Sequence, residues 1–429
     1  MNFINLRLRL KTATTGIKPT VARLKQFCLW GTFILCLSAQ SSPAEGDLFQ
    51  GEKFTSQDAV LVTNAAGDTL YQWQAEKTMT PASLVKLITS YLAIDKWGLG
   101  HRFSTQFYLY QKGLWVKGFG DPYLISEELD LVANHLNSLT NLAFDTINID
   151  IDYFKREPLP GGSAVSDPYN APLSAVAVNF NTVMLRRDAG ELVSAEDQTP
   201  LTNTARRFAK GIGKKPVRVN LQNADLAQQQ FAEILLAKMA KQGVTIKINQ
   251  TTPLAAELAY THKNSHVLAD MLRGALQYSN NFVTNQLYLL LGEDLGQTMQ
   301  FAKSTQTVQQ QLNDKLAWTN ASIVDGSGLS RDNQASARQL LGVLQKLEPH
   351  KALLKQYPLK RVLKDLDQTH LVVAYAKSGT LNGVHNFAGI LEIGAKQHYF
   401  VFMFNRQMPS RYRERLLQKL ADQLQSNES

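Results

Sequence analysis

The stretch "TMTPASLVKLIT", from Thr78 to Thr89, places Ser83 and Lys86 three residues apart at the expected start of a helix. Residues at positions i and i+3 share a helix face, with Cβ atoms about 5–6 Å apart. A buried amine near other cations loses its proton more easily and can then accept the proton of a hydroxyl group. The spacing therefore fits a serine nucleophile beside a lysine base, although such a short pattern also arises by chance in ordinary capped helices.

The residues around this pair predict a helix over residues 81–96. Thr80 can cap its start, Pro81 suits its first turn, and Gly98 follows its end. Ser83 would then lie in the first turn, where free N–H groups and the helix dipole favour developing negative charge. The helix is thus expected to begin where a serine nucleophile would need it.

Strand patterns lie at both ends of the chain. Residues 59–74 predict two strands around a turn, and residues 265–347 are mostly helical in pattern. Three more strands and a last helix are expected at 371–378, 385–393, 397–405 and 410–424. The economical arrangement is an α/β (α+β) domain in which one antiparallel sheet is built from both chain ends and covered by helices.

The middle of the chain has a different pattern. Short alternating segments such as "TINIDIDYF" (Thr146–Phe154) are interrupted by a loop rich in proline and glycine. We interpret residues 102–248 as a β-rich insertion, which leaves 45–101 and 249–429 as the two parts of the catalytic domain.

Residues 1–44 resemble a secretory signal peptide. Six basic residues and no acid precede an apolar run from Phe27 to Ala39, which is followed by small residues. The run is shorter than the roughly 20 residues that span a bilayer. We expect cleavage after Ala44, with Ala39 as an alternative, a periplasmic or otherwise extracytoplasmic protein, and membrane contact only if the leader stays uncleaved.

Removal of this leader changes the composition. Both cysteines, Cys28 and Cys36, lie within it, so the mature chain would have neither disulfides nor a thiolate nucleophile. Leu35 is too large for the residue before a lipidated cysteine. Six of the 45 basic residues also leave, and the remaining 39 against 36 acidic residues reduce the net charge from +9 to +3. The chain therefore lacks the strong positive charge typical of nucleic-acid-binding proteins.

Two further segments carry polar residues that could take part in chemistry. "QYSNNFVTN" (Gln277–Asn285) presents Ser279 and Asn281 between two helical patterns, and by itself is more typical of a helix cap. "YAKSGTLNG" (Tyr375–Gly383) adds Lys377-Ser378-Gly379 to an otherwise apolar strand, where the glycine would let a ligand or backbone approach closely. By itself this segment is more typical of a strand entering a turn.

The conjunction of the three segments is more specific than any one of them. S-x-x-K, S-x-N and K-[ST]-G each occur once, and in that order. Together they resemble the motif set of penicillin-binding proteins and serine β-lactamases. Asn280 replaces the usual aspartate and Ser378 the usual threonine, and both changes keep the functional atoms.

Three longer segments narrow the resemblance. They are "FGDPYL" (Phe119–Leu124), "YNAPLSAVAVNFNTVML" (Tyr169–Leu185) and "DGSGLSRDN" (Asp325–Asn333). The chain is similar to the D-alanyl-D-alanine carboxypeptidase/endopeptidase family of the penicillin-binding protein 4 type, peptidase family S13. The resemblance implies a β-lactamase/transpeptidase-like domain, with an insertion between the first two motifs that is shorter here than expected for the family.

The resemblance also implies a reaction. Ser83 would attack the carbonyl between two D-alanines of a peptidoglycan stem peptide, and Lys86 would take its proton. Ser279 would relay a proton to the leaving D-alanine, and Asn281 would orient Lys86. Terminal carboxylate binding is expected from Lys377, Ser378, Gly379 and Thr380, with backbone N–H groups of Ser83 and Thr380 as the oxyanion hole. β-Lactam antibiotics should acylate the same serine.

Two other functions and a metal site are weaker alternatives. A serine β-lactamase would need a deacylating carboxylate, which the sequence does not identify, and a catalytically silent wall-binding protein would not need the intact motif set. His262 and His266 have the i, i+4 spacing of a zinc motif, but no glutamate follows His262. We therefore expect no metal and no cofactor.

Overall fold

The computed structural model describes residues 47–139, 143–163, 166–293, 298–359 and 372–426. The predicted signal peptide and Leu371, the first residue of a predicted strand, lie outside these ranges. No helix within them has the length and apolar character needed to cross a membrane.

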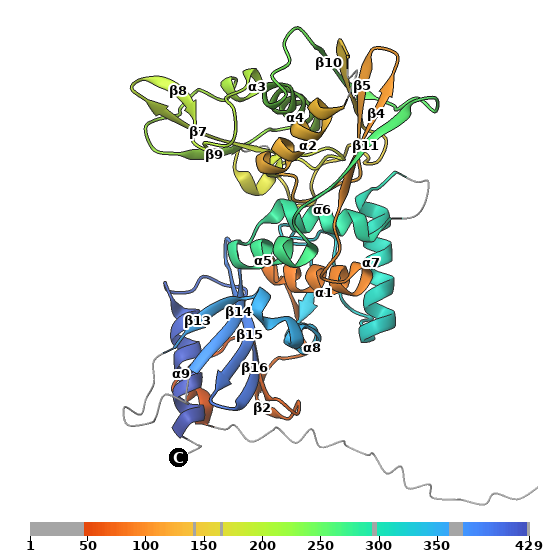
Figure 1. The fold of residues 1–429 in the computed structure, drawn as a ribbon. Coiled ribbons are helices and arrows are strands. Elements are labelled where there is room, and N and C mark those ends of the chain that lie inside the picture. The colour runs from red at the N-terminus through yellow and green to blue at the C-terminus, as the bar shows by residue number, and fades with distance from the viewer. Residues whose placement is uncertain (1–46, 140–142, 164–165, 294–297, 360–371, 427–429) are drawn as a thin grey trace, which may run out of the picture. The chain divides into compact units, whose positions relative to one another are not determined.

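The largest sheet has six antiparallel strands in the order β13-β14-β15-β16-β1-β2, so both ends of the chain contribute to it (Figure 1). This arrangement confirms the sheet expected from the strand patterns. Its strands are β1 (Asp58–Asn64), β2 (Thr69–Trp73), β13 (Lys355–Pro358), β14 (Val372–Leu381), β15 (Val384–Ile393) and β16 (Lys396–Phe404). A two-stranded pair, β3 (Thr78–Met79) with β12 (Ala335–Ser336), lies outside this sheet.

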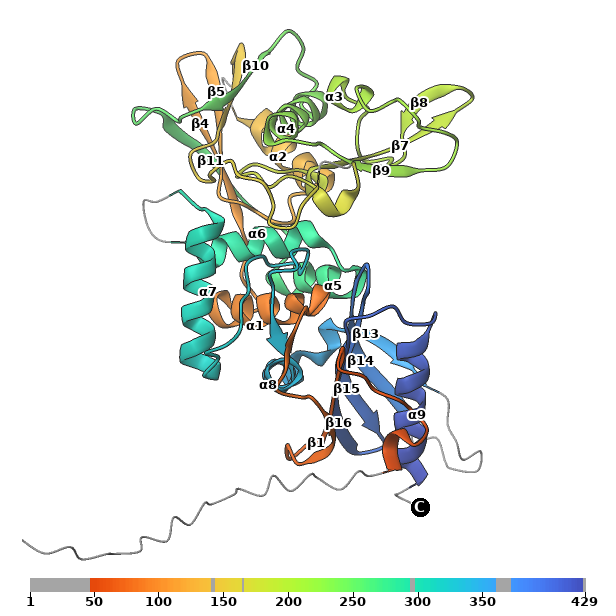
Figure 2. The same cartoon turned by 180° about the vertical axis from the view of Figure 1, so that it is seen from behind.

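Each face of the six-stranded sheet has its own core, because side chains alternate along a strand. In β16, Val401 and Met403 pack with the helices that follow the first strands, whereas Phe400 and Phe402 pack with α9. Figures 1 and 2 show α9 on one face of the sheet and α8 on the other. The helices are α1 (Val85–Trp97), α5 (Leu268–Tyr278), α6 (Asn281–Leu291), α7 (Phe301–Leu316), α8 (Ala337–Leu347) and α9 (Tyr412–Ser426).

The helix after Ser83 begins later than predicted. A 3-10 turn, η2 (Ala82–Leu84), precedes α1, which starts at Val85 and not at residue 81. Thr80 does not cap the helix; its backbone is held by asparagine side chains described below. Gly98 ends α1 with a φ of 73°, as predicted.

The inserted segment contains a five-stranded sheet in the order β10-β6-β5-β4-β11 and a three-stranded sheet in the order β8-β7-β9. Their strands are β4 (Ser104–Tyr110), β5 (Gly113–Gly118), β6 (Thr146–Asp150), β7 (Thr182–Asp188), β8 (Glu191–Ser194), β9 (Val217–Asn220), β10 (Thr245–Gln250) and β11 (Glu257–Lys263). Strand β10 crosses the predicted boundary at residue 248, and β11 still belongs to this sheet. The division into domains stays a prediction.

Helices in the insertion were missed by the sequence analysis. They are α2 (Ser126–Ser138), α3 (Asn203–Arg206) and α4 (Ala224–Lys238), with the short turns η3 (Pro168–Asn170) and η4 (Asn179–Asn181). Two further short turns, η1 (Asp47–Phe49) and η5 (Glu348–Leu353), lie outside the insertion. Leu129, Val132 and Leu136 of α2 pack in one core with the five-stranded sheet. Their i, i+3, i+7 spacing is typical of a helix, but this signal was missed because the insertion was interpreted as β-rich.

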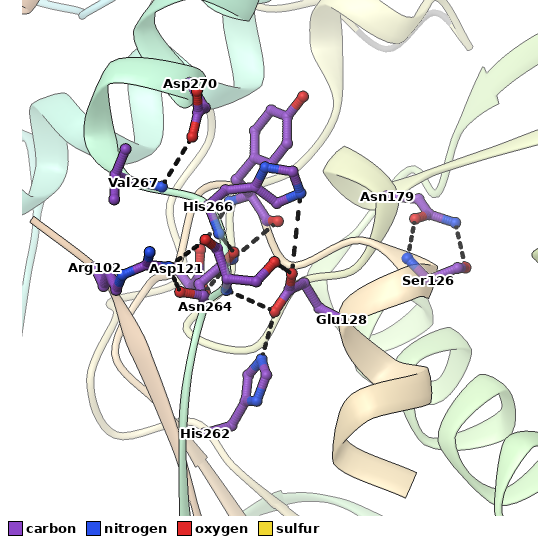
Figure 3. A network of polar contacts seen from close by, with 12 residues as sticks. Arg102, Asp121, Ser126, Glu128, Asn179, His262, Asn264, His266, Val267 and Asp270 are labelled. Atoms are coloured by element: carbon purple, nitrogen blue, oxygen red, sulfur yellow. Dashed lines mark hydrogen bonds and ion pairs between the residues drawn. The ribbon is translucent and has the colours of Figure 1, made fainter. Parts of the chain in front are cut away.

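A buried polar network surrounds the chain where it passes from β11 to α5 (Figure 3). Glu128 from α2 lies 2.7 Å from His262 Nε2 and accepts hydrogen bonds from the backbone N–H and hydroxyl of Ser265. Asp121 accepts from Asn264 Nδ2 at 2.9 Å. We refer to these five residues as the junction network. It fixes the start of the helix that leads to Ser279.

Candidate active site

Ser83 lies on η2, which is enclosed by two glycine-containing segments. A Cβ placed on Gly328 would come within 1.8 Å of Ala82 O, and one placed on Gly379 within 2.7 Å of Pro81 O. Gly328 also has a φ of +81°, a conformation that favours glycine. The third motif and the "DGSG" loop therefore need these glycines to approach the backbone of the nucleophile.

Two asparagines hold the segment before Ser83. Asn386 Nδ2 and Asn405 Nδ2 donate to Thr80 O at 2.9 Å and 3.1 Å, and Asn405 Oδ1 accepts from Thr80 N at 2.9 Å. The sequence analysis did not identify either residue. Both lie within the strands predicted at 385–393 and 397–405, and the local pattern gave no sign that they reach a residue more than 300 positions away.

Lys86 is fully buried, and its amine lies within hydrogen-bond distance of three neutral oxygens. Lys86 Nζ lies 3.1 Å from Ser83 Oγ, 2.7 Å from Asn281 Oδ1 and 2.7 Å from Ser327 O. Burial, followed by the charge of Lys377, lowers the pKa of Lys86 well below its ordinary value. A neutral amine in contact with a serine hydroxyl is the arrangement that a general base requires.

The second motif forms a tight link between α5 and α6. Ser279 ends α5 with a φ of 59°, and the Asn280 side chain accepts from Val283 N at 3.2 Å to cap α6. Asn281 is the first residue of α6, and its amide bridges the site by accepting from Lys86 and donating to Tyr169 O at 3.3 Å. Asn280 therefore makes the helix cap predicted for this segment, and its neighbour Asn281 makes the contact with Lys86.

Lys377 of the third motif forms a hydrogen bond with Ser279 of the second motif. Its Nζ donates to Ser279 Oγ at 3.0 Å and to Ser378 O at 2.9 Å. Burial, with the nearby charges of Arg413 and Lys355, lowers the pKa of Lys377 to about 8. The amine of Lys377 therefore stays mostly charged at neutral pH.

These contacts gather the five predicted catalytic residues into two linked groups. Ser83, Lys86 and Asn281 form one, and Ser279 and Lys377 form the other, joined through the α5–α6 link. The predicted carboxylate-binding residues Ser378, Gly379 and Thr380 continue along β14. Their roles stay predictions, because the contacts give placement and not activity.

Arg413 from α9 lies behind this part of β14 and was missed by the sequence analysis. Its Nη1 donates to Thr380 Oγ1 at 3.0 Å, to Asn386 O at 3.0 Å and to Gly379 O at 3.3 Å. The amphipathic pattern of α9 indicated only which face is buried. It did not indicate that an arginine reaches the third motif.

Asp325 organises the loop that supplies an acceptor to Lys86. Its fully buried carboxylate accepts from the backbone N–H groups of Ser327 and Gly328, both at 2.7 Å, and from Asn333 Nδ2 at 2.6 Å. Ser327 thus serves through its backbone carbonyl. From the sequence this loop contributed only to the family resemblance, and the aspartate was assigned no role.

The two histidines with zinc-like spacing both lie near Glu128. His262 faces Glu128 in the junction network, with a second ring contact to Tyr260. Over the described ranges there is no cluster of three or more His, Cys, Asp or Glu side chains suited to a metal ion.

Comparisons with known proteins agree on one family. The sequence profile of the D-Ala-D-Ala carboxypeptidase 3 (S13) family matches residues 47–210 and 208–424. The chain is 25% identical over 341 residues to a D-alanyl-D-alanine carboxypeptidase from an Actinomadura species, a match that spans 66% of this chain and 63% of the relative's length.

Solved structures show the same fold. Penicillin-binding protein 4 from Haemophilus influenzae superposes with a TM-score of 0.67 and 19% identity, covering 90% of this chain and 99% of that one. The same protein in complex with a β-lactam gives a TM-score of 0.61 and 20% identity, covering 89% and 98%. The fold match confirms the transpeptidase-like architecture with its insertion. Because the family profile spans nearly all of the described chain, this protein belongs to the D-Ala-D-Ala carboxypeptidase 3 (S13) family.

Proposed function

We propose that this protein is a serine DD-carboxypeptidase and DD-endopeptidase. It cleaves D-Ala-D-Ala ends and D-Ala cross-links of peptidoglycan stem peptides through an acyl-enzyme on Ser83. The observation that carries the proposal is the contact of 3.1 Å between Ser83 Oγ and a buried Lys86 amine that has only neutral acceptors. Family membership makes this chemistry the first expectation, and the geometry supports it.

Acylation begins at Ser83. Its Oγ attacks the carbonyl carbon of the penultimate D-alanine, and its proton passes to Lys86 Nζ. The backbone N–H groups of Ser83 and Thr380 receive the developing oxyanion, for which one donor is worth about 3 kcal/mol. The close approach of β14 supports this role, since a Cβ on Gly379 would lie 3.2 Å from Ser83 N.

The leaving group departs past Ser279. As the C–N bond breaks, Ser279 Oγ gives a proton to the leaving nitrogen and takes in turn the proton that Lys86 received. Lys377, which donates to Ser279 at 3.0 Å, holds this hydroxyl and attracts the substrate's terminal carboxylate with Ser378 and Thr380. Water then attacks the acyl-enzyme, and its proton returns through Lys86 to Ser83 Oγ.

Two relatives support this choice of substrate. The Actinomadura relative is a D-alanyl-D-alanine carboxypeptidase, and the Haemophilus protein has been solved with a β-lactam bound. We extend both properties to this chain: stem peptides as substrates and β-lactams as covalent inhibitors. The basic leader, which lies outside the described residues, supports export to the periplasm or cell surface.

Mass spectrometry after incubation with penicillin tests the proposal. A penicillin adduct on the peptide containing Ser83 is expected for the wild type and not for Ser83→Ala. A wild-type protein that forms no adduct would favour a catalytically silent wall-binding protein. Comparison of hydrolysis rates then separates the enzymes: faster turnover of penicillin than of a D-Ala-D-Ala peptide would indicate a β-lactamase.

A further inference from the structure

A cavity of about 490 Å³ opens beside the second motif. Ser279 and Asn281 form one side of it, Tyr278 lies at the same end, and Tyr123, Phe180 and Arg218 line the remainder. This volume falls within the range of pockets that bind small ligands. A leaving D-alanine, whose side chain is a methyl group, does not need such a space.

One wall of the cavity is built from an unusual backbone. Asn179, Phe180 and Asn181 have φ values of 48°, 60° and 51°, in the left-handed region that residues other than glycine rarely adopt. Buried side-chain bonds hold this turn: Asn179 Oδ1 accepts from Ser126 N at 2.8 Å, and Asn181 Nδ2 donates to Pro172 O at 2.7 Å. Backbone of this kind persists where the surroundings enforce it, often at functional sites.

A second wall is fixed by the junction network. Asp121 Oδ1 accepts from Tyr123 N at 2.9 Å, and Asn264 Nδ2 donates to Tyr123 O at 3.0 Å. The Tyr123 and Phe180 rings meet edge to face, with centroids 5.4 Å apart. Buried polar residues therefore hold the backbone that carries both aromatic side chains (Asp121, Asn179 and Asn264 are labelled in Figure 3).

The cavity's rim carries aromatic side chains that nothing in the described chain covers. Tyr278, directly before Ser279, is 84% exposed, and Tyr169, whose carbonyl oxygen contacts Asn281, is 62% exposed. Exposed aromatic rings beside a reactive group are typical of surfaces that bind a partner molecule.

The proposed reaction places the leaving group on this side of the site. Its nitrogen must approach Ser279 Oγ to receive a proton, while its carboxylate meets Lys377 and Thr380. With these two groups fixed, the side chain of the leaving residue is the substituent left to extend beyond Ser279. In a terminal D-alanine this is a methyl group; in a cross-link it is the arm of a diamino acid that carries a second stem peptide.

We propose that the cavity is a leaving-group subsite that receives this arm and the adjoining part of the second stem. The inference rests on the proposed function and names the residues that would favour cross-links over free D-alanine ends. Arg218 supplies a cation in the cavity wall, held by Glu196 and by a hydrogen bond of 2.9 Å to Thr182 Oγ1. Such a cation suits the carboxylates of a stem peptide.

Gly274 offers a way to fill the cavity. A Cβ at this helical position would meet nothing nearer than the Tyr123 ring at 3.7 Å, so a leucine would project into open space. Gly342 of α8 is a matched control, because a Cβ there would meet no atom within 4 Å and the residue does not line the cavity.

The experiment compares kcat/KM of the purified protein for a cross-linked muropeptide dimer and for a pentapeptide ending in D-Ala-D-Ala. Gly274→Leu is expected to lower the dimer-to-pentapeptide ratio by about tenfold, as expected when a pocket loses space for part of a substrate. Gly342→Leu should leave the ratio unchanged. Tyr278→Ala, at an exposed position that poses little risk to folding, should lower the ratio by about threefold.

Unchanged ratios in both cavity variants would overturn the subsite, as would wild-type protein that cleaves the pentapeptide but not the dimer. A penicillin adduct on Ser83 in every variant would show that the catalytic group is intact. Absence of that adduct in the wild type would instead overturn the proposed function on which the subsite rests.

Discussion

The catalytic cleft and the junction network both bury charged side chains, but they treat them differently. Among the described residues, the hydrogen-bond acceptors of Lys86 and Lys377 are all neutral oxygens, and burial lowers the pKa of both amines. Burial alone would raise the pKa of Glu128, but hydrogen bonds from His262 and Ser265 outweigh it and lower that pKa.

The difference distinguishes the lysines of the catalytic cleft from the charged residues that hold the fold together. A buried group with an opposite charge or strong donors keeps its charge and fastens elements together, whereas a buried amine without a carboxylate partner loses its proton more readily than an exposed one. Asp121 supports the distinction within the junction network itself. Its direct donors are neutral, and burial raises its pKa to about 6.

Lys86→Met tests the catalytic side of the comparison and should have the largest effect. Without the base, the rate of penicillin acylation should fall by about 10⁴-fold. The melting temperature should not fall, because the variant removes a buried amine that has no carboxylate partner. Lys96→Met, on the same helix but outside the cleft, is the control. Acylation of Lys86→Met at the wild-type rate would contradict the role of the amine.

Glu128→Gln tests the structural side. Loss of the carboxylate beside His262 should lower the free energy of unfolding by about 3 kcal/mol, measured by urea denaturation. Penicillin acylation by the folded variant should change by less than about threefold. A stable variant with a large loss of acylation would reverse the assignment of roles.

The same variant predicts a pH dependence of stability. Because the pKa of Glu128 is lowered in the folded protein, its stabilising contribution is present above the unfolded pKa of about 4.3 and is lost as the pH falls through the folded value. Wild type and Glu128→Gln should therefore converge in stability at acidic pH. A constant difference down to about pH 3 would show that the carboxylate's charge does not matter.

Activity should depend on pH through the two lysines. Lys86 must be neutral and Lys377 charged, so kcat/KM should rise with pH through the lowered pKa of Lys86 and fall above about 8, where Lys377 loses its proton. The alkaline limb should approach a tenfold decrease per pH unit. The rate of hydrolysis of a D-Ala-D-Ala peptide, measured between about pH 6 and 10, gives this pH profile of kcat/KM. A flat profile would contradict the requirement for a charged Lys377.

Arg413→Met should produce the smallest effect. The arginine's charge helps to lower the pKa of Lys377, so its removal should move the alkaline limb upward by less than about one pH unit. Arg415→Met, on the same helix and bonded instead to Ser410 O, is the matched control. A downward shift in Arg413→Met would mean that Arg413 acts mainly through its bonds to β14 and not through its charge.

Much of the architecture could be predicted because it follows from local patterns. The apolar run in β16 indicated a strand, and the glycine after α1 indicated where that helix ends. The start of α1 was mispredicted because Thr80 bonds to Asn386 and Asn405, which are distant in sequence. Helices α2 and α4 were missed because short alternating segments dominated the interpretation of the insertion.

The candidate site likewise contains residues that the sequence predicted and residues that it did not. The three motifs identified Ser83, Lys86, Ser279, Asn281 and Lys377, which the structure brings together. Arg413 and the asparagines that hold Thr80 could not be found, because each acts through contacts with backbone groups far away in the sequence. Asp325 was missed for a different reason, because it accepts from backbone N–H groups within its own loop. Backbone partners leave no pattern of residue types.

The sequence by itself determined which reactive groups this protein carries and that the serine and lysine share one helical turn, because helix periodicity is a local property. Only the tertiary structure decided that the Lys86 amine is buried beside neutral acceptors, that Lys377 keeps its proton, and that a cavity opens next to Ser279. Burial, the nearest charges and empty space depend on residues brought together from the whole chain, and these fix a pKa and the room for a substrate.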